Sequence, residues 1–145
     1  MSDTTTLIDL ATQVRRDTIR MLKAAPAEAV TWAPPGTANH ILWHAGHALW
    51  LQDHFAIKPL TGKSELPEGW YDLFTSGSEP AKITAWPEQE AVIEALQAQH
   101  RRTVQLLEAV HDGHGPVRLK DAEAWQSFTS SLIHGLHDEA RHQGE

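Results

Sequence analysis

The chain has 145 residues, the usual size of one domain, so we expect residues 1–145 to fold as a single unit. It has no cysteine, which excludes disulfides, zinc sites built from thiolates, iron–sulfur clusters and cysteine nucleophiles. The formal net charge of −7 argues against a nucleic-acid partner, because binding phosphates requires clustered lysine and arginine, and here only Arg15-Arg16 and Arg101-Arg102 are paired.

Two helices are predicted in the first part of the chain. Residues 3–24 carry apolar side chains at approximately helical spacing, and a proline-rich loop follows them. A second helix is expected to begin near Thr37–Asn39, whose side chains can cap it. It is expected to end near Ile57, before Pro59.

The second half of the chain begins with its least regular segment, residues 58–86. A loop of that length is unusual in a compact domain, and its aromatic residues 70–74 predict that it packs down on the helices as a lid. A third helix is expected over residues 87–111, with Pro87 as its first helical residue. A fourth is expected from Asp121, its cap, to the last residues.

No segment alternates as a strand does, so we expect an all-α protein, a four-helix bundle with a long connection between its second and third helices. That connection is long enough to run the length of the bundle, so a simple up-down-up-down order is not required. The first residues lack the basic segment of a secretion signal, and no apolar stretch is long enough to cross a bilayer. We therefore expect a soluble, cytoplasmic protein without a membrane partner.

The chain has ten histidines, and four of them lie on the second predicted helix. His40, His44, His47 and His54 are four, three and seven residues apart, which places them on one helical face. A solvated polar face, or capping of the helix N-terminus, is one interpretation. His47, however, lies among residues expected in the core, and a metal ion is one way to give a buried imidazole nitrogen a partner. Gly46 is a poor helix former, which indicates that another backbone or a ligand approaches closely there.

The fourth predicted helix carries a second group of histidines and acidic residues. Asp138 and His142 are four residues apart and are therefore neighbours on one face, and His134 continues that face one turn earlier. With one histidine from a facing helix they compose a site of two imidazoles and a carboxylate. Such a site suits zinc, iron, nickel or manganese and leaves positions for water or substrate. A solvated helix end is the alternative interpretation.

Two other metal patterns fit less well. The chain has no His-Glu-x-x-His sequence, which excludes a zincin helix. Glu108-x-x-His111 and Glu139-x-x-His142 match half of a di-iron bundle site, which also requires an inward glutamate from each remaining helix. The acidic residues available there are Asp9, Asp17 and Asp53. We therefore rank a di-iron site last.

Residues 39–50 (NHILWHAGHALW) and 137–145 (HDEARHQGE) resemble the two signatures of the DinB-like superfamily, and the WAPPG stretch at residues 32–36 resembles it too. The similarity extends over essentially the whole chain. It implies a four-helix bundle that holds one divalent metal ion, with His47 as one ligand. The other two ligands are implied at fourth-helix positions four residues apart, the second of which is His142.

The first of these fourth-helix positions is Asp138, where the commonest family pattern has histidine. An acidic residue there is similar to the mycothiol-dependent maleylpyruvate isomerase branch, which has glutamate. Asp138 is therefore the expected third ligand, and His134 or His137 is the alternative. A degenerate site without metal is a further alternative.

The function implied by the resemblance is that of a metal-dependent enzyme, either a thiol S-transferase or a hydrolase. The ion would activate a thiol or a water molecule as the nucleophile. We expect a small-molecule substrate, with a low-molecular-weight thiol among the candidates, and a homodimer. His44 and His134 are candidate catalytic residues, and residues 70–74 are expected to form an apolar wall of the pocket. The alternative is a non-catalytic bundle that binds a ligand or acts as a dimerising regulator.

Overall fold

The computed structural model describes residues 2–145, with side chains from Thr4 onward, and in that range it is all-helical, as predicted. The long helices are α1 (Ser2–Ala24), α2 (Ile41–Gln52), α5 (Gln89–His111) and α6 (Ala122–Gln143). α2 continues through a π-helical turn, η2 (Asp53–Ile57), into the single-turn helix α3 (Lys58–Thr61). The connections hold the short helix α4 (Trp70–Phe74) and 3-10 turns at Ala27–Ala29, Pro80–Lys82 and Val117–Lys120. Within the described range, no helix is both long enough and apolar enough to cross a bilayer.

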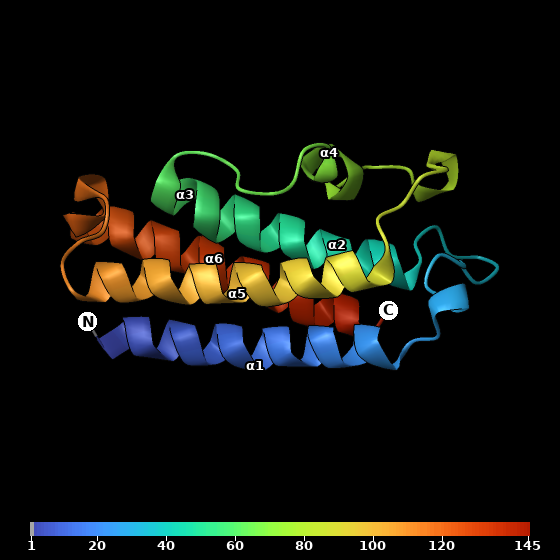
Figure 1. The fold of residues 1–145 in the computed structure, drawn as a ribbon. Coiled ribbons are helices and arrows are strands. Elements are labelled where there is room, and N and C mark those ends of the chain that lie inside the picture. The colour runs from blue at the N-terminus through green and yellow to red at the C-terminus, as the bar shows by residue number, and fades with distance from the viewer. Residues whose placement is uncertain (1) are drawn as a thin grey trace.

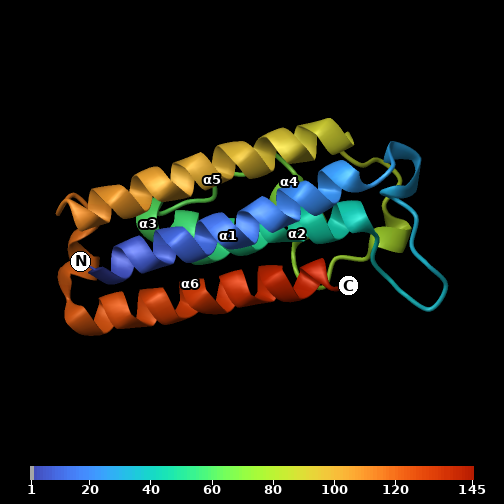
Figure 2. The same cartoon turned by 90° about the horizontal axis from the view of Figure 1, so that it is seen from below.

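The long helices lie side by side (Figure 1). α1 packs against α2, α5 and α6, and α2 also packs against α5 and α6. α1 and α6 run in one direction, whereas α2 and α5 run in the opposite direction (Figures 1 and 2). Because α2 and α5 are parallel, residues 62–88 return along the length of the molecule, which explains the long connection between them.

The second helix differs from the prediction at both ends. It begins at Ile41 and not at Thr37–Asn39, because the His40 side chain caps it by accepting a hydrogen bond from the backbone N–H three residues later (3.0 Å). At the other end the helix passes Pro59 and ends at Gly62, whose φ of 94° is left-handed. The π-helical turn before Pro59 alters the backbone hydrogen bonding just where a residue without an N–H must fit.

The last two long helices begin close to their predicted positions. α6 is capped by Asp121, as expected, since its carboxylate accepts a hydrogen bond from the backbone N–H three residues later (2.9 Å). α5 begins at Gln89, so Pro87 precedes the helix and is not its first residue. The Gln89 amide donates to the carbonyl oxygens of Leu22 and Ala25 at 2.7 and 3.0 Å. These bonds tie the start of α5 to the end of α1.

The core consists of two apolar clusters with a buried polar layer at their boundary. One cluster joins the first half of α1 to the end of α5 and to α6, and the other joins the end of α1 to α2 and the start of α5. Arg15 and Glu139 lie where the two meet, and each is 1% exposed or less. Charged groups this deeply buried require partners, and those partners connect the long helices.

The connection between α3 and α5 packs onto α2, as predicted. Phe74 of α4 is fully buried, and Trp70 packs against the second apolar cluster. α4 therefore lies directly over the part of α2 that carries the histidines.

Candidate metal centre

Four aromatic rings are stacked along one side of α2 and the turn that follows it. The ring centroids of Trp43 and His47 are 4.5 Å apart with planes inclined by 11°, and those of His47 and Trp50 are 5.3 Å apart at 8°. His54 continues the stack, 4.8 Å from Trp50. These spacings place the four residues on one helical face. Because the His47 ring lies between two indole rings, it has little freedom to rotate.

His47 is buried, and its Nδ1 lies 2.7 Å from the carbonyl oxygen of Phe74. Since a carbonyl can only accept, Nδ1 carries the proton, and neutral His47 keeps its lone pair on Nε2. Gly46 makes this contact possible, because a Cβ at that position would overlap the Phe74 ring. The close approach predicted at Gly46 is therefore made by an aromatic side chain of α4.

α6 brings Asp138 and His142 to the same place. Asp138 Oδ2 lies 3.8 Å from His142 Nε2, and the rings of His47 and His142 meet edge to face with centroids 4.8 Å apart. One ligand atom from each of His47, Asp138 and His142 lies within 4.8 Å of the other two. The structure thus brings together the three residues that the sequence assigns to a metal ion.

The two oxygens of Asp138 face different partners. Arg141 donates to Oδ1 through Nε and Nη2 at 3.0 and 2.6 Å, and Oδ2 is the oxygen nearer to His142. Burial raises the pKa of Asp138, but the hydrogen bond and the positive charge of Arg141 outweigh it and hold the pKa below its ordinary value. Asp138 is therefore an anion at neutral pH.

The imidazoles on α2 are neutral under the same conditions. Burial, which penalises the charged ring, is the main reason that the pKa of His47 is lowered. Burial and, next, the neighbouring His142 lower the pKa of His44 to about 4. Metals bind the neutral form of histidine. His47 therefore does not have to lose a proton before it can bind an ion.

The outer nitrogen of His142 also has partners. Nδ1 lies 2.8 Å from His44 Nδ1 and 2.8 Å from a carboxylate oxygen of Glu145. Histidines that bind a metal usually donate their other N–H to such a group, which fixes the ring. His44, expected to be catalytic, thus contacts a candidate ligand. His44, His142 and Glu145 also form a second group of ligand atoms within 4.8 Å of one another, which shares His142 with the first.

A cavity of about 260 Å³ adjoins the candidate ligands between α1, α2 and the end of α6. Its lining includes Met21, Ile41, His44, Glu139, His142 and Glu145. Residues 70–74, expected to form a wall of the pocket, do not line this cavity. They pack into the space left by Gly46, and α4 contributes a backbone carbonyl to His47 instead.

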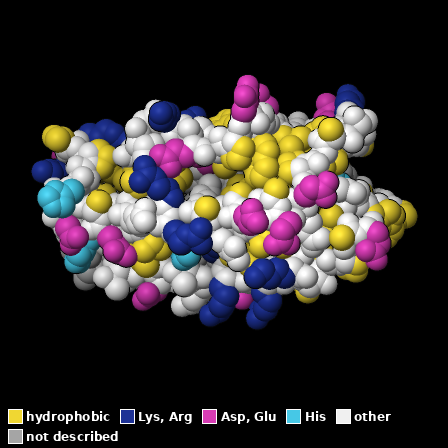
Figure 3. Space-filling view, in the orientation of Figure 1, with side chains coloured by type: hydrophobic (Ala, Val, Ile, Leu, Met, Phe, Trp, Pro, Cys, Tyr) yellow, Lys and Arg dark blue, Asp and Glu magenta, His cyan; other side chains and the backbone are white. Residues whose placement is uncertain are grey.

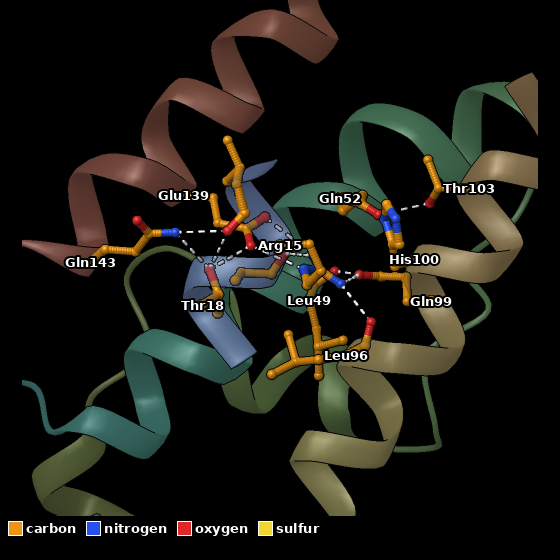
Figure 4. A network of polar contacts seen from close by, with 12 residues as sticks. Arg15, Thr18, Leu49, Gln52, Leu96, Gln99, His100, Thr103, Glu139 and Gln143 are labelled. Carbon is orange, nitrogen blue, oxygen red and sulfur yellow. Dashed lines mark hydrogen bonds and ion pairs between the residues drawn. The ribbon is translucent and has the colours of Figure 1, made fainter. Parts of the chain in front are cut away.

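Arg15 connects all four long helices through a network of polar contacts (Figure 4). From α1 its guanidinium donates to both carboxylate oxygens of Glu139 on α6, at 3.0 and 3.2 Å. It also donates to a backbone carbonyl of α5 at 3.0 Å and to the carbonyl of Ala48 on α2 at 3.4 Å. Because Ala48 follows His47 and Glu139 follows Asp138, this one side chain fixes the two ligand-bearing helices relative to each other.

From the sequence, Glu139 is considered only for a di-iron site and Phe74 only for a pocket wall, and Arg15 is assigned no role at the site. Arg15 did give a signal, since it stands seven residues before Leu22 on the apolar face of α1, where a charge needs a buried partner. Glu139 gave a similar signal, because it stands three residues after the buried Leu136 and so lies on the same face of α6. Phe74 gave none, because its contribution is a backbone carbonyl that any residue carries.

The other histidines considered from the sequence lie elsewhere. His40 caps α2, and His54 closes the aromatic stack. His134, expected to be catalytic, is exposed on α6, with its ring against that of Phe55, and His137 is also exposed. Among the described residues, none of these four histidines belongs to either group of ligand atoms. The structure therefore does not bring His134 to the candidate ligands.

The chain matches a known protein family. A family model described as the DinB superfamily matches residues 10–145, a range that contains all three candidate ligands and the Arg15 network. No protein of curated function matches the chain.

Proposed function

Because the chain belongs to the DinB superfamily, we propose that it is a four-helix-bundle enzyme that uses one divalent metal ion held by His47, Asp138 and His142. The observation that carries the proposal is the convergence of one ligand atom from each residue to within 4.8 Å. Two imidazoles and a carboxylate suit zinc, iron, nickel or manganese and leave positions for water or substrate.

The surroundings of these residues support the proposal. His47 is held in one plane between Trp43 and Trp50, and its bond to Phe74 leaves Nε2 with the lone pair that a metal requires. Asp138 is ionised at neutral pH, so its charge favours a cation. His47 and Asp138 thus offer donor atoms of the right kind and in the right protonation state to bind a divalent ion.

The proposed reaction is the transfer of a low-molecular-weight thiol, or a hydrolysis. When bound, a divalent ion lowers the pKa of a coordinated thiol or water molecule. The cavity of about 260 Å³ beside His142 has room for part of a small substrate, and Met21 and Ile41 give it apolar contacts. His44 lines the same cavity, and its Nδ1 lies 2.8 Å from Nδ1 of His142, so we assign it the role of holding this ligand in place.

Elemental analysis of protein purified without a metal-affinity tag tests the proposal. We expect about one divalent ion per chain, the number that a single mononuclear site binds. His47→Ala and His142→Ala should each abolish binding. His137→Ala is the matched control, because His137 is exposed on the same helix as His142, and it should retain the metal. Stoichiometric metal that survives both ligand substitutions contradicts the proposal.

The non-catalytic alternative makes a different prediction. An ion that binds only the native state must raise stability, so a chelator should lower the Tm of the metalloprotein. A metal-free protein whose Tm ignores the chelator supports a bundle that binds another ligand or dimerises. Sedimentation equilibrium of the same sample tests the expected homodimer.

A further inference from the structure

A second cavity lies on the side of α2 that faces α5. Its volume is about 340 Å³, and none of its lining residues lines the cavity beside His142. Its apolar walls are Leu49, Ile57, Leu66, Ala95 and Ala98. Figure 3 shows the face of the molecule above it, where hydrophobic side chains gather between α5 and the connection that follows α3. Cavities of this size and character commonly hold small molecules.

Asp53 is the unusual residue of this cavity. It lines the cavity and is completely buried. Its Oδ1 accepts a hydrogen bond from the backbone N–H of Glu65 at 2.9 Å, whereas Oδ2 has no hydrogen-bond partner among the described residues. A buried carboxylate oxygen without a donor costs free energy. Asp53 also begins the π-helical turn η2, and such turns occur frequently at functional sites.

Two donor side chains of the cavity lining, Arg102 and Gln99, already bond other acceptors. Arg102 donates through Nε and Nη2 to the two oxygens of Glu65, at 2.9 Å each. Gln99 donates to the carbonyl oxygen of Leu49 at 2.9 Å. The charges of Arg102 and Glu65 cancel, so the net charge of the lining is that of Asp53. The missing partner of Asp53 should therefore be a cationic hydrogen-bond donor.

We propose that this cavity binds a small organic cation, a primary ammonium group on a short alkyl chain. The ammonium donates to Asp53 Oδ2, and the chain lies against the apolar walls. An ammonium group carries three donors and a full positive charge, and the protein's net charge of −7 attracts cations. The inference does not depend on the proposed metal centre, because the two sites share no residue.

Titration with n-butylammonium, followed by NMR chemical shifts, tests this inference. We expect saturable binding with a dissociation constant of about 1 mM, in the range open to so small a ligand, and shifts confined to the cavity lining. 1-Butanol has a chain of the same length without the charge and should bind roughly tenfold more weakly or worse, because charge-assisted hydrogen bonds are the stronger ones. Asp53→Asn should weaken the binding of butylammonium by a similar factor. Asp138→Asn is the matched control, which should leave this binding unchanged while it weakens the metal centre.

Three results overturn the inference: no saturable binding, equal binding of butanol and butylammonium, or an Asp53→Asn variant that binds as the wild type does. If Asp53→Asn does not fold, Ala98→Leu provides the second test, because it fills the cavity from an exposed position of α5 and keeps the carboxylate. Ala98→Leu should abolish binding, and unchanged affinity in this variant equally overturns the inference. If the purified wild type contains no metal but still binds butylammonium, that result refutes only the proposed metal centre.

Discussion

Arg15 and Glu139 form a buried ion pair with an Nε···Oε2 distance of 3.0 Å, and each side chain is 1% exposed. Glu139 follows Asp138 in the chain, and the same guanidinium bonds the carbonyl of Ala48, which follows His47. The pair therefore links the packing of the core to the position of the candidate ligands. A change to it should affect stability and metal binding together.

Arg15→Met is expected to lower the free energy of unfolding by about 3–5 kcal/mol, because it leaves Glu139 buried without its counter-charge. Urea unfolding of the metal-free protein measures the change. Arg20→Met is the matched control on the same helix, because Arg20 is exposed and paired with Asp17, and it should cost less than about 1 kcal/mol. Equal losses in the two variants would show that the pair is not important for stability.

Gly46→Ala is expected to destabilise the protein by about 1–3 kcal/mol, the usual range for overpacking, because the new Cβ overlaps the Phe74 ring. Displacing Phe74 also removes the acceptor of His47 Nδ1, so metal affinity should fall roughly 10–100-fold, as for other outer partners of metal ligands. Competition with a chromophoric chelator measures the affinity.

Two further variants control this experiment. Adding Phe74→Leu to Gly46→Ala should recover part of both losses, since it removes the clashing ring and keeps the backbone carbonyl. Gly144→Ala should change neither property, because its Cβ would make an ordinary contact at 3.5 Å. The proposed role of Gly46 is wrong if alanine is as well tolerated at position 46 as at position 144.

Asp138→Asn is expected to weaken metal binding at least roughly tenfold without unfolding the protein, since losing a ligand should cost no less than losing an outer partner. Glu108→Gln tests the di-iron alternative, because Glu108 belongs to the Glu-x-x-His pattern that such a site would use. It should leave both metal content and affinity unchanged, as measured by elemental analysis and chelator competition. Loss of metal in Glu108→Gln would favour the di-iron site.

The stability of the metal-free protein is expected to change with pH, and His40 is one cause of that change. Burial lowers the pKa of His40 below the ordinary 6.5, and its Nε2 has no hydrogen-bond partner among the described residues. The unfolded chain therefore takes up a proton at a higher pH than the folded one does. Neutral, buried His40 therefore lowers no stability above pH 6.5. As the pH falls below that value toward the folded pKa, protonation favours the unfolded chain and stability is lost.

His40→Asn tests this dependence, because asparagine is a good N-cap residue and does not titrate in this range. Urea unfolding in the presence of a chelator should show a smaller loss of stability between about pH 7 and pH 5 than in the wild type. Part of the loss should remain, since the pKa values of His44, His47 and His100 are lowered too. An unchanged pH dependence would exclude His40 as a contributor.

The sequence could predict those features that depend on spacing along one helix. Asp138 and His142 are four residues apart, and His47 stands among core residues, so all three are candidates from the sequence, whereas the complete ligand set is what the family resemblance implies. The Asp121 cap was equally readable, because aspartate before an apolar-periodic run is a local signal.

Features that depend on contacts between distant segments could not be predicted in this way. Pro59 was expected to stop the helix, and the π-helical turn that accommodates it has no local signature. The contact of Phe74 with Gly46 joins two segments whose relative position follows only from the packed structure.

The ion pair of the core also constrains how the chain folds, since its two residues are 124 positions apart. While α6 is undocked, Arg15 has no anion to receive it in the interior, and burying an unpaired charge is strongly unfavourable. An assembly of α1, α2 and α5 alone should therefore remain open and hydrated around that guanidinium. The native state is then expected to appear in one cooperative step, slowed by the closure of so long an intervening loop.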